Sequence, residues 1–181
     1  MVAGAVLCGG ANRRMGRDKA LVPVHGAPMV MHVVSALRSA GCDPVQAIGG
    51  DAPALAALGL DVVGDGHPGE GPLGGVITAL AASADSTVAV VVVACDLPHL
   101  TEHTLQAVMA ALGDADVAVA RTDRLQPMCA VWRRTVLQPL RDAFDAGERR
   151  VESVLSSLKF VEVPVNRQDL ANVNTPGDLP K

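Results

Sequence analysis

A run of seven apolar residues, 88–94, most constrains what this chain can fold into. Most of its members are β-branched valines, and no polar residue alternates with them. A strand without alternation has both faces covered, as in a parallel sheet with helices on each side. The run ends abruptly in Cys95-Asp96-Leu97-Pro98. We therefore expect a central buried strand that places a carboxylate at one edge of a sheet.

Short β-branched runs alternate with Ala- and Leu-rich stretches of helical period, which predicts an α/β protein with a mostly parallel sheet. The length of 181 residues and the absence of a linker or repeat favour one domain, residues 1–181. The expected strands are 2–8, 45–48, 60–63, 88–94, 117–120, 128–132 and 160–163. The expected helices are 28–40, 52–58, 76–84, 101–112, 136–146 and 150–158. Residues 64–75 are expected to be loop, because they include six glycines and two prolines.

Composition and charge exclude several classes of function. The net charge is −4, and the sequence contains one Trp, two Phe and no Tyr, so we expect no nucleic-acid partner. The four cysteines form no CxxC pair and the five histidines no ligand pattern, which favours reduced structural thiols over a zinc site. No signal peptide or membrane-length apolar run is visible, so we expect a cytoplasmic protein without a membrane partner.

The segment after the first expected strand, residues 7–19, combines glycines with basic residues. It reads Leu7-Cys8-Gly9-Gly10-Ala11-Asn12-Arg13-Arg14-Met15-Gly16-Arg17-Asp18-Lys19. Adjacent glycines let a backbone approach phosphate oxygens, and the Arg and Lys side chains supply countercharge. No Gly-Lys-Ser/Thr follows and the Rossmann spacing is absent, so we interpret the segment as a different polyphosphate loop. The alternative is a glycine turn with solvated basic residues.

A GxGxxG pattern at Gly69, Gly71 and Gly74 does not indicate a dinucleotide site. It lies in a Pro-containing segment several residues past its strand, whereas the dinucleotide fingerprint needs a tight strand-to-helix turn. We interpret the segment Gly71-Pro72-Leu73-Gly74-Gly75 as a loop whose small residues leave room for a ligand. An ordinary connector remains the alternative.

Two aspartates follow expected strands at the same sheet edge. Asp96 ends the most buried strand, and Mg²⁺ binds through one or two carboxylates together with substrate phosphates. Asp96 is therefore the candidate metal ligand, with a turn-capping role before Pro98 as the alternative. Asp65 is a second candidate carboxylate, with a plain turn role as the alternative.

Two polar clusters near the end of the chain, Gly147-Glu148-Arg149-Arg150-Val151 and Asn172-Val173-Asn174-Thr175-Pro176, flank apolar runs. Asx and Arg groups in such positions either cap helices or meet an anionic substrate. Chemistry alone leaves both interpretations open.

These motifs together resemble the molybdenum cofactor guanylyltransferases. The segment Leu7-Cys8-Gly9-Gly10 through Arg14-Met15-Gly16-Arg17-Asp18-Lys19 is similar to the family signature LAGGxSxRMGxDK, and the later motifs follow in the family's order. The resemblance covers almost the full length. It implies a three-layer, Rossmann-like nucleotidyltransferase fold with a mostly parallel mixed sheet, its N-terminal part binding nucleotide and its C-terminal part the pterin.

The resemblance also implies an activity and residue roles. The enzyme would transfer GMP from Mg-GTP to the terminal phosphate of molybdopterin or its molybdenum-loaded form, releasing pyrophosphate, with molybdoenzyme assembly proteins as downstream partners. The nucleotide would contact Leu7, Cys8, Gly9, Gly10, Lys19, Asp65 and Asp96, and Gly74, Asn172 and Asn174 would lie on the pterin side. Asp96 would hold Mg²⁺, while Lys19 and Arg14 would supply fixed positive charge in catalysis.

Two other functions remain open from the sequence. One is a related transferase that uses CTP on the molybdenum cofactor, or another nucleotide on a sugar phosphate. The pair Gly9-Gly10 favours guanine, since a residue without Cβ lets the larger base approach the backbone. The other is a non-enzymatic nucleotide-binding protein of the same fold, against which the presence of Lys19 and Asp96 argues.

Overall fold

In a computed structural model of the protein, the apolar run forms the central strand β6 (Ala89–Ala94). The structure describes residues 1–9 and 18–173. Val91 and Val93 point into a first hydrophobic core, and Val90 and Val92 into a second core on the opposite face. All four are at most 1% exposed. The predicted burial of both faces is therefore confirmed.

The main sheet has seven strands in the order β5-β4-β1-β6-β8-β7-β9. Their bounds are β1 Val2–Leu7, β4 Val45–Ile48, β5 Asp61–Val63, β7 Val117–Arg121, β8 Leu125–Arg133 and β9 Phe160–Pro164, in addition to β6. β8 pairs antiparallel with both β6 and β7, while the other neighbours pair in parallel. The sheet is thus mixed and mostly parallel, as predicted.

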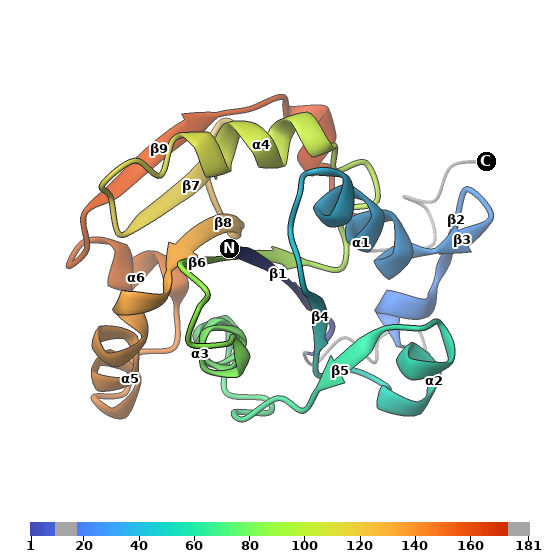
Figure 1. The fold of residues 1–181 in the computed structure, drawn as a ribbon, viewed down its shortest axis with the longest axis horizontal. Coiled ribbons are helices and arrows are strands. Elements are labelled where there is room, and N and C mark those ends of the chain that lie inside the picture. Colours follow the sequence, from blue (N-terminus) through green and yellow to red (C-terminus); the bar gives the residue numbers. More distant parts are fainter. Residues whose placement is uncertain (10–17, 174–181) are drawn as a thin grey trace.

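Helices cover the two faces of this sheet and complete three layers (Figure 1). Their bounds are α1 Met29–Ser39, α2 Ala52–Ala57, α3 Pro72–Ala82, α4 Glu102–Ala110, α5 Leu137–Asp145 and α6 Val151–Leu155. The helices α1, α2 and α4 contribute to the first core, and α3, α5 and α6 to the second. The predicted α/β architecture is confirmed, because both faces of the sheet need a helical cover to exclude water.

The helix α3 begins at Pro72, so the prediction of loop over residues 64–75 is wrong for its last four residues. Pro72 occupies the first helical turn, where its missing N–H costs nothing. The two glycines allow close packing: a Cβ on Gly74 would lie 2.6 Å from His67 Cβ, and one on Gly75 would lie 3.1 Å from Leu7 Cδ1. Tertiary packing therefore outweighs the low helix propensity of glycine here.

Other differences from the prediction are short elements. The hairpin of β2 (Pro23–Val24) and β3 (Ala27–Pro28) was not predicted, and each of its strands has only two residues. The strand β8 starts three residues earlier than expected. In the part of the chain that the structure describes, no helix has the length and apolar character needed to cross a membrane.

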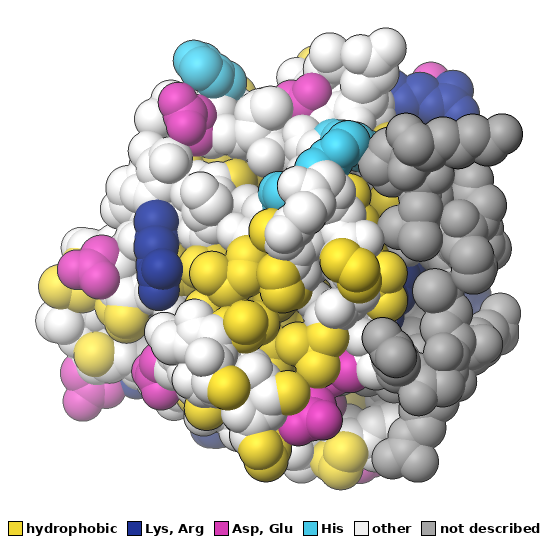
Figure 2. Space-filling view, turned by 90° about the vertical axis from the view of Figure 1, so that its right-hand side faces the viewer, with side chains coloured by type: hydrophobic (Ala, Val, Ile, Leu, Met, Phe, Trp, Pro, Cys, Tyr) yellow, Lys and Arg dark blue, Asp and Glu magenta, His cyan; other side chains and the backbone are white. Residues whose placement is uncertain are grey.

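One face of the molecule is shown in Figure 2. Hydrophobic side chains gather near its centre, and the described Lys and Arg side chains on it lie well apart from one another.

We expect Leu105→Ala to lower the free energy of unfolding by about 2–5 kcal/mol, because the Leu105 side chain is fully buried between α4 and the sheet. Urea titration would measure the loss, followed by the fluorescence of Trp132, the one tryptophan of the sequence, which is fully buried. Gln106→Ala, at an exposed position of the same helix, is the control and should change stability little. Equal losses in the two variants would contradict the packing of α4 described above.

Candidate active site

The carboxyl ends of the parallel strands β5, β4, β1 and β6 lie at one edge of the sheet. The chain passes from β1 to β4 through α1 on one face and from β5 to β6 through α3 on the other. The two directions diverge between β1 and β6, and open α/β sheets bind ligands outside such a switch point. Cys8 and Gly9 follow β1 at this point, and Cys95 and Asp96 follow β6.

An ion pair joins the two sides of the switch point. Lys19 Nζ donates to Asp96 Oδ2 at 2.7 Å, and the two side chains are only 9% and 13% exposed. The second carboxylate oxygen of Asp96, Oδ1, is buried, and no described residue donates a hydrogen bond to it. Buried polar atoms are normally paired. Asp96 Oδ1 is therefore a candidate position for a bound ligand.

Asp18 fixes the position of Lys19. One oxygen of Asp18 accepts the N–H of Ala20 at 3.0 Å and so begins the short helix η2 (Lys19–Leu21). The other oxygen accepts the N–H of Asp51 at 2.7 Å, which ties this helix to the segment after β4. Asp18 was not among the predicted site residues, although it lies next to Lys19 in the basic segment.

The chain near its C-terminus returns to the same carboxylate. Asn172 Nδ2 lies 3.4 Å from Asp96 Oδ2, and the N–H of Val173 donates to the Asp96 carbonyl oxygen at 3.1 Å. The Val173 side chain packs in a small buried cluster with Val22, Val24 and Met29. The structure therefore brings together Asn172, Lys19 and Asp96, three of the residues that the sequence predicted for the site.

Asp65 lies beside Gly9 at the end of β1. Its Oδ1 accepts the N–H of His67 at 2.9 Å and lies 3.4 Å from the Thr78 hydroxyl. A Cβ on Gly9 would lie 3.3 Å from Asp65 Oδ2, so a side chain there would crowd this carboxylate. Gly9 itself is exposed. The two predicted nucleotide contacts, Gly9 and Asp65, are therefore neighbours.

Leu7 and Cys8 point away from the open edge. Leu7 is partly buried and packs against the second core, whereas Cys8 is 7% exposed and faces the first. The N–H groups of Cys8 and Gly9 both donate to the Ile48 carbonyl oxygen, at 2.9 and 3.2 Å. The Gly9 N–H is therefore paired within the protein in this structure.

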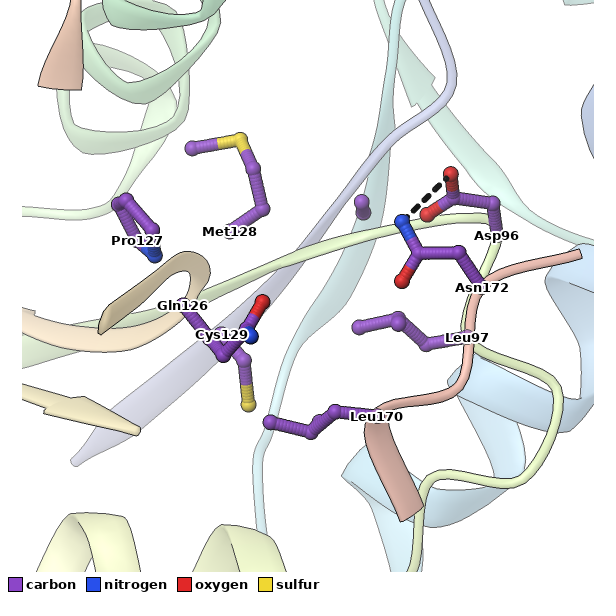
Figure 3. Close-up of a pocket in the computed structure, with 9 residues that line it drawn as sticks. Asp96, Leu97, Gln126, Pro127, Met128, Cys129, Leu170 and Asn172 are labelled. Carbon is purple, nitrogen blue, oxygen red and sulfur yellow. Dashed lines mark hydrogen bonds between the residues drawn. The ribbon is translucent and has the colours of Figure 1, made fainter. Parts of the chain in front are cut away.

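A cavity of about 140 Å³ opens beside Asp96. Figure 3 shows Asp96 and Asn172 on one side and Gln126, Pro127 and Met128, from the start of β8, on the other. Its remaining lining residues are apolar or weakly polar: Ala94, Leu97, Cys129 and Leu170. The cavity thus combines apolar walls with two amide side chains and a carboxylate. Gln126 and Met128 were not among the predicted site residues, because the expected strand began only at Met128 and Gln126 preceded it.

The other predicted site residues divide into two groups. Gly10, Arg14 and Asn174 lie outside the described residues. Gly74 lies in the first turn of α3, tightly packed against His67, and is not among the residues that line the cavity beside Asp96.

Residues 4–163 match the family model of the MobA-like NTP transferase domain. A probable molybdenum cofactor guanylyltransferase of Chloroflexus aggregans is 34% identical over 99% of this chain and 92% of its own length. The chain belongs to the MobA-like NTP transferase family. The resemblance to molybdenum cofactor guanylyltransferases is confirmed, and the protein is an enzyme of the nucleotidyltransferase class.

Further relatives of this nucleotidyltransferase agree with the assignment. The molybdenum cofactor guanylyltransferase of Rhodobacter capsulatus is 33% identical over 98% of this chain and 93% of its own length. The crystal structure of Rv0371c from Mycobacterium tuberculosis has a TM-score of 0.81 and 26% identity, and covers 98% of this chain and 94% of that one. Rv0371c has also been solved as a complex with manganese.

The cysteines of this nucleotidyltransferase should react slowly with dithionitrobenzoate in the native state. All four are free and buried, and a thiol reacts as its thiolate. A hydrogen bond with Cys95, together with burial, raises the pKa of the Cys8 thiol well above its usual value, and burial raises the pKa of Cys42 to about 11 and that of Cys129 to about 12. At pH 8 roughly one Cys42 thiol in a thousand is then ionised.

Absorbance of the released thionitrobenzoate would follow the labelling. Ala81→Cys, at an exposed position of α3, provides the matched reactive thiol and should react first. In guanidinium chloride the four native thiols should react as fast as the added one. Fast labelling of the unaltered native protein would contradict the burial of the four cysteines.

Proposed function

We propose that this enzyme transfers GMP from Mg-GTP to the terminal phosphate of molybdopterin or its molybdenum-loaded form, with release of pyrophosphate. The observation that carries the proposal is the position of Asp96. Its carboxylate lies between Lys19 on the side of the basic segment and a cavity with apolar walls on the side of the C-terminal segment. A carboxylate in that position would contact both the nucleotide donor and the acceptor phosphate.

The Lys19–Asp96 ion pair supports a catalytic assignment more than a stabilising one. Burying two charges costs several kcal/mol per ion, and their attraction often fails to offset this cost. Such a pair is better explained as a preformed charge arrangement for a polyphosphate, since fixed charges stabilise charge that develops during phosphoryl transfer. Lys19 would bind the phosphates, and Arg14 would add a second positive charge.

The residues at Asp96 fit a magnesium ion. Asp96 Oδ1 is buried and receives no hydrogen bond from the described residues, so it has a free coordination position. Mg²⁺ takes one or two protein carboxylates and completes its coordination with water and phosphate oxygens. Asp96 would hold the ion together with the substrate. When bound, the ion neutralises charge that develops on the leaving pyrophosphate.

The cavity beside Asp96 suits one end of the acceptor. Its volume of about 140 Å³ is smaller than the pockets of roughly 300–1,000 Å³ that enclose whole ligands, so only part of a pterin would enter it. The amides of Gln126 and Asn172 offer donors and acceptors, and Met128 and Leu170 offer apolar contact. The assignments of Asn172, Asn174 and Gly74 to the pterin side remain predictions.

The chemical step needs no covalent intermediate on the protein. An oxygen of the acceptor phosphate forms a bond to the α-phosphorus of GTP, the bond from that phosphorus to the β-phosphate oxygen breaks, and pyrophosphate leaves. The residues of the chain hold the two phosphates in line and balance their charge. Delivery of the product to molybdoenzyme assembly proteins remains a prediction.

We expect Asp96→Asn to reduce turnover by a factor of about 10²–10³, the loss typical of one transition-state charge contact. The change keeps the shape of the side chain but removes the charge that pairs with Lys19 and would hold magnesium. Pyrophosphate release from GTP, with molybdopterin and a magnesium titration, measures it. Asp85→Asn is the matched control, because the Asp85 side chain is 98% exposed and pairs with Arg134 far from this edge. Unaltered magnesium-dependent turnover of Asp96→Asn would refute the assignment.

The same assay compares GTP with CTP as donors. We expect turnover with GTP to exceed turnover with CTP by at least about tenfold, since Gly9 leaves room for the larger base beside Asp65. Equal or faster turnover with CTP would favour the cytidylyl transferase. Binding of GTP without any pyrophosphate release would exclude transferase activity with this acceptor.

A further inference from the structure

The guanidinium of Arg149 is held at four points in the cluster 147–151. Its Nη1 donates to the carbonyl oxygens of Phe144 and Glu148 at 2.6 and 2.9 Å, and its Nη2 donates to Glu70 Oε2 at 3.1 Å. The group also lies 3.8 Å above the centre of the Phe144 ring, within the range of a cation–π interaction. These contacts of the guanidinium are all with protein groups, and the Arg149 side chain is 40% exposed.

The Glu148 carboxylate accepts hydrogen bonds from the backbone of the same cluster. Glu148 Oε1 accepts the N–H groups of Arg149 and Arg150 at 2.7 and 2.8 Å. Hydrogen bonds from the backbone N–H groups of Arg150 and then Arg149 hold the pKa of the Glu148 carboxyl below its usual value. These bonds go to backbone groups that precede α6, and the N-cap residue of that helix, Arg150, makes no side-chain cap hydrogen bond.

Arg149 also touches the segment 64–71 and the start of α3. Its carbonyl oxygen accepts the N–H of Leu73 at 3.3 Å. A Cβ on Gly71, whose φ is +95°, would lie 3.0 Å from the same oxygen, so Gly71 passes directly over the Arg149 backbone. These two contacts are made by the Arg149 backbone, and the ion pair to Glu70 is made by its side chain. Together they hold the C-terminal end of the segment 64–71.

A second route leads from Arg149 to Asp65. The Phe144 ring beneath the guanidinium packs against the His67 ring, with 4.4 Å between the centroids. The N–H of His67 in turn donates to Asp65 Oδ1 at 2.9 Å. Arg149 thus supports both ends of the segment that carries Asp65, although it lies in a different part of the sequence.

We propose that Arg149 is a positioning residue for nucleotide binding: it holds the segment 64–71 so that Asp65 stays beside Gly9. The proposal rests on the proposed function, because the ligand that would meet Asp65 is the nucleotide donor. Arg149 acts through Phe144, His67 and Glu70 and not through contact with the substrate. Its loss therefore weakens the nucleotide side of the reaction selectively.

Arg149→Gln tests the role by kinetics. We expect the KM for GTP to rise about tenfold while kcat and the KM for molybdopterin stay within about twofold, since misplaced binding groups cost roughly this much. Arg149→Lys keeps the charge but cannot make the forked contacts, so we expect partial rescue. Glu70→Gln should raise the KM for GTP only about twofold, because a half-exposed ion pair contributes little. Arg134→Gln, which breaks a separate ion pair to Asp85, is the control.

Hydrogen exchange in the nucleotide-free protein gives a readout that needs no substrate. The amides of Gly66, His67 and Glu70 are hydrogen-bonded within this region, so their exchange reports its order. We expect faster exchange over residues 64–71 in Arg149→Gln and unchanged exchange in Arg134→Gln.

The two readouts separate the proposals. Unchanged exchange together with an unchanged KM for GTP would overturn the positioning role. A parallel rise of both KM values would also overturn it, since that pattern indicates a general loss of structure. Faster exchange in Arg149→Gln, with a wild-type enzyme that neither binds nor uses GTP, would leave the positioning of Asp65 intact and refute the proposed donor.

Discussion

The ion pair between Lys19 and Asp96 is the interaction on which the candidate site depends. It joins two residues 77 positions apart in the sequence, and both side chains are nearly buried. Each partner is held by its own surroundings. Asp18 accepts the N–H groups of Ala20 and Asp51 and so holds the short helix that contains Lys19. Asp96 follows the buried strand β6. Because both side chains are nearly buried, loss of Lys19 would leave the Asp96 carboxylate without its charged partner.

The parallel pairing of β1 with β6 makes this ion pair geometrically possible. Leu7 lies opposite Ala94 in the ladder, so the residues that follow the two strands emerge side by side. Gly50 closes the same region from the side of β4. Its φ is +81°, and a Cβ there would lie 2.9 Å from Cys8 Cβ and 3.1 Å from Asp18 Oδ2. Only glycine fits this turn without displacing the groups that hold Lys19.

The elements that the sequence predicted well are those set by local pattern. The valine run of β6 predicts a strand covered on both faces, and the strand spacing predicts which residues reach the same edge. For this reason Asp96 and Asp65 were predicted to lie at the same edge of the sheet. The start of α3 was wrong because Gly74 and Gly75 are selected by contact with His67 and Leu7, and such contacts do not appear in a local pattern. The cavity residue Gln126 was missed, and the role of Arg149 was left open. In both cases the partners in space are far away in the sequence.

The site is assembled from both layers of helices, and this division has a functional meaning. Segments on the side of the first core, η2 and residues 170–173, meet at Asp96, where the proposed function places the metal and the phosphates. The segment 64–71, which leads into α3 on the side of the second core, carries Asp65, the proposed nucleotide contact. The central strands β1 and β6 connect the two halves through their shared ladder. A change at Arg149 therefore acts on one half, whereas a change at Asp96 acts where the two halves meet.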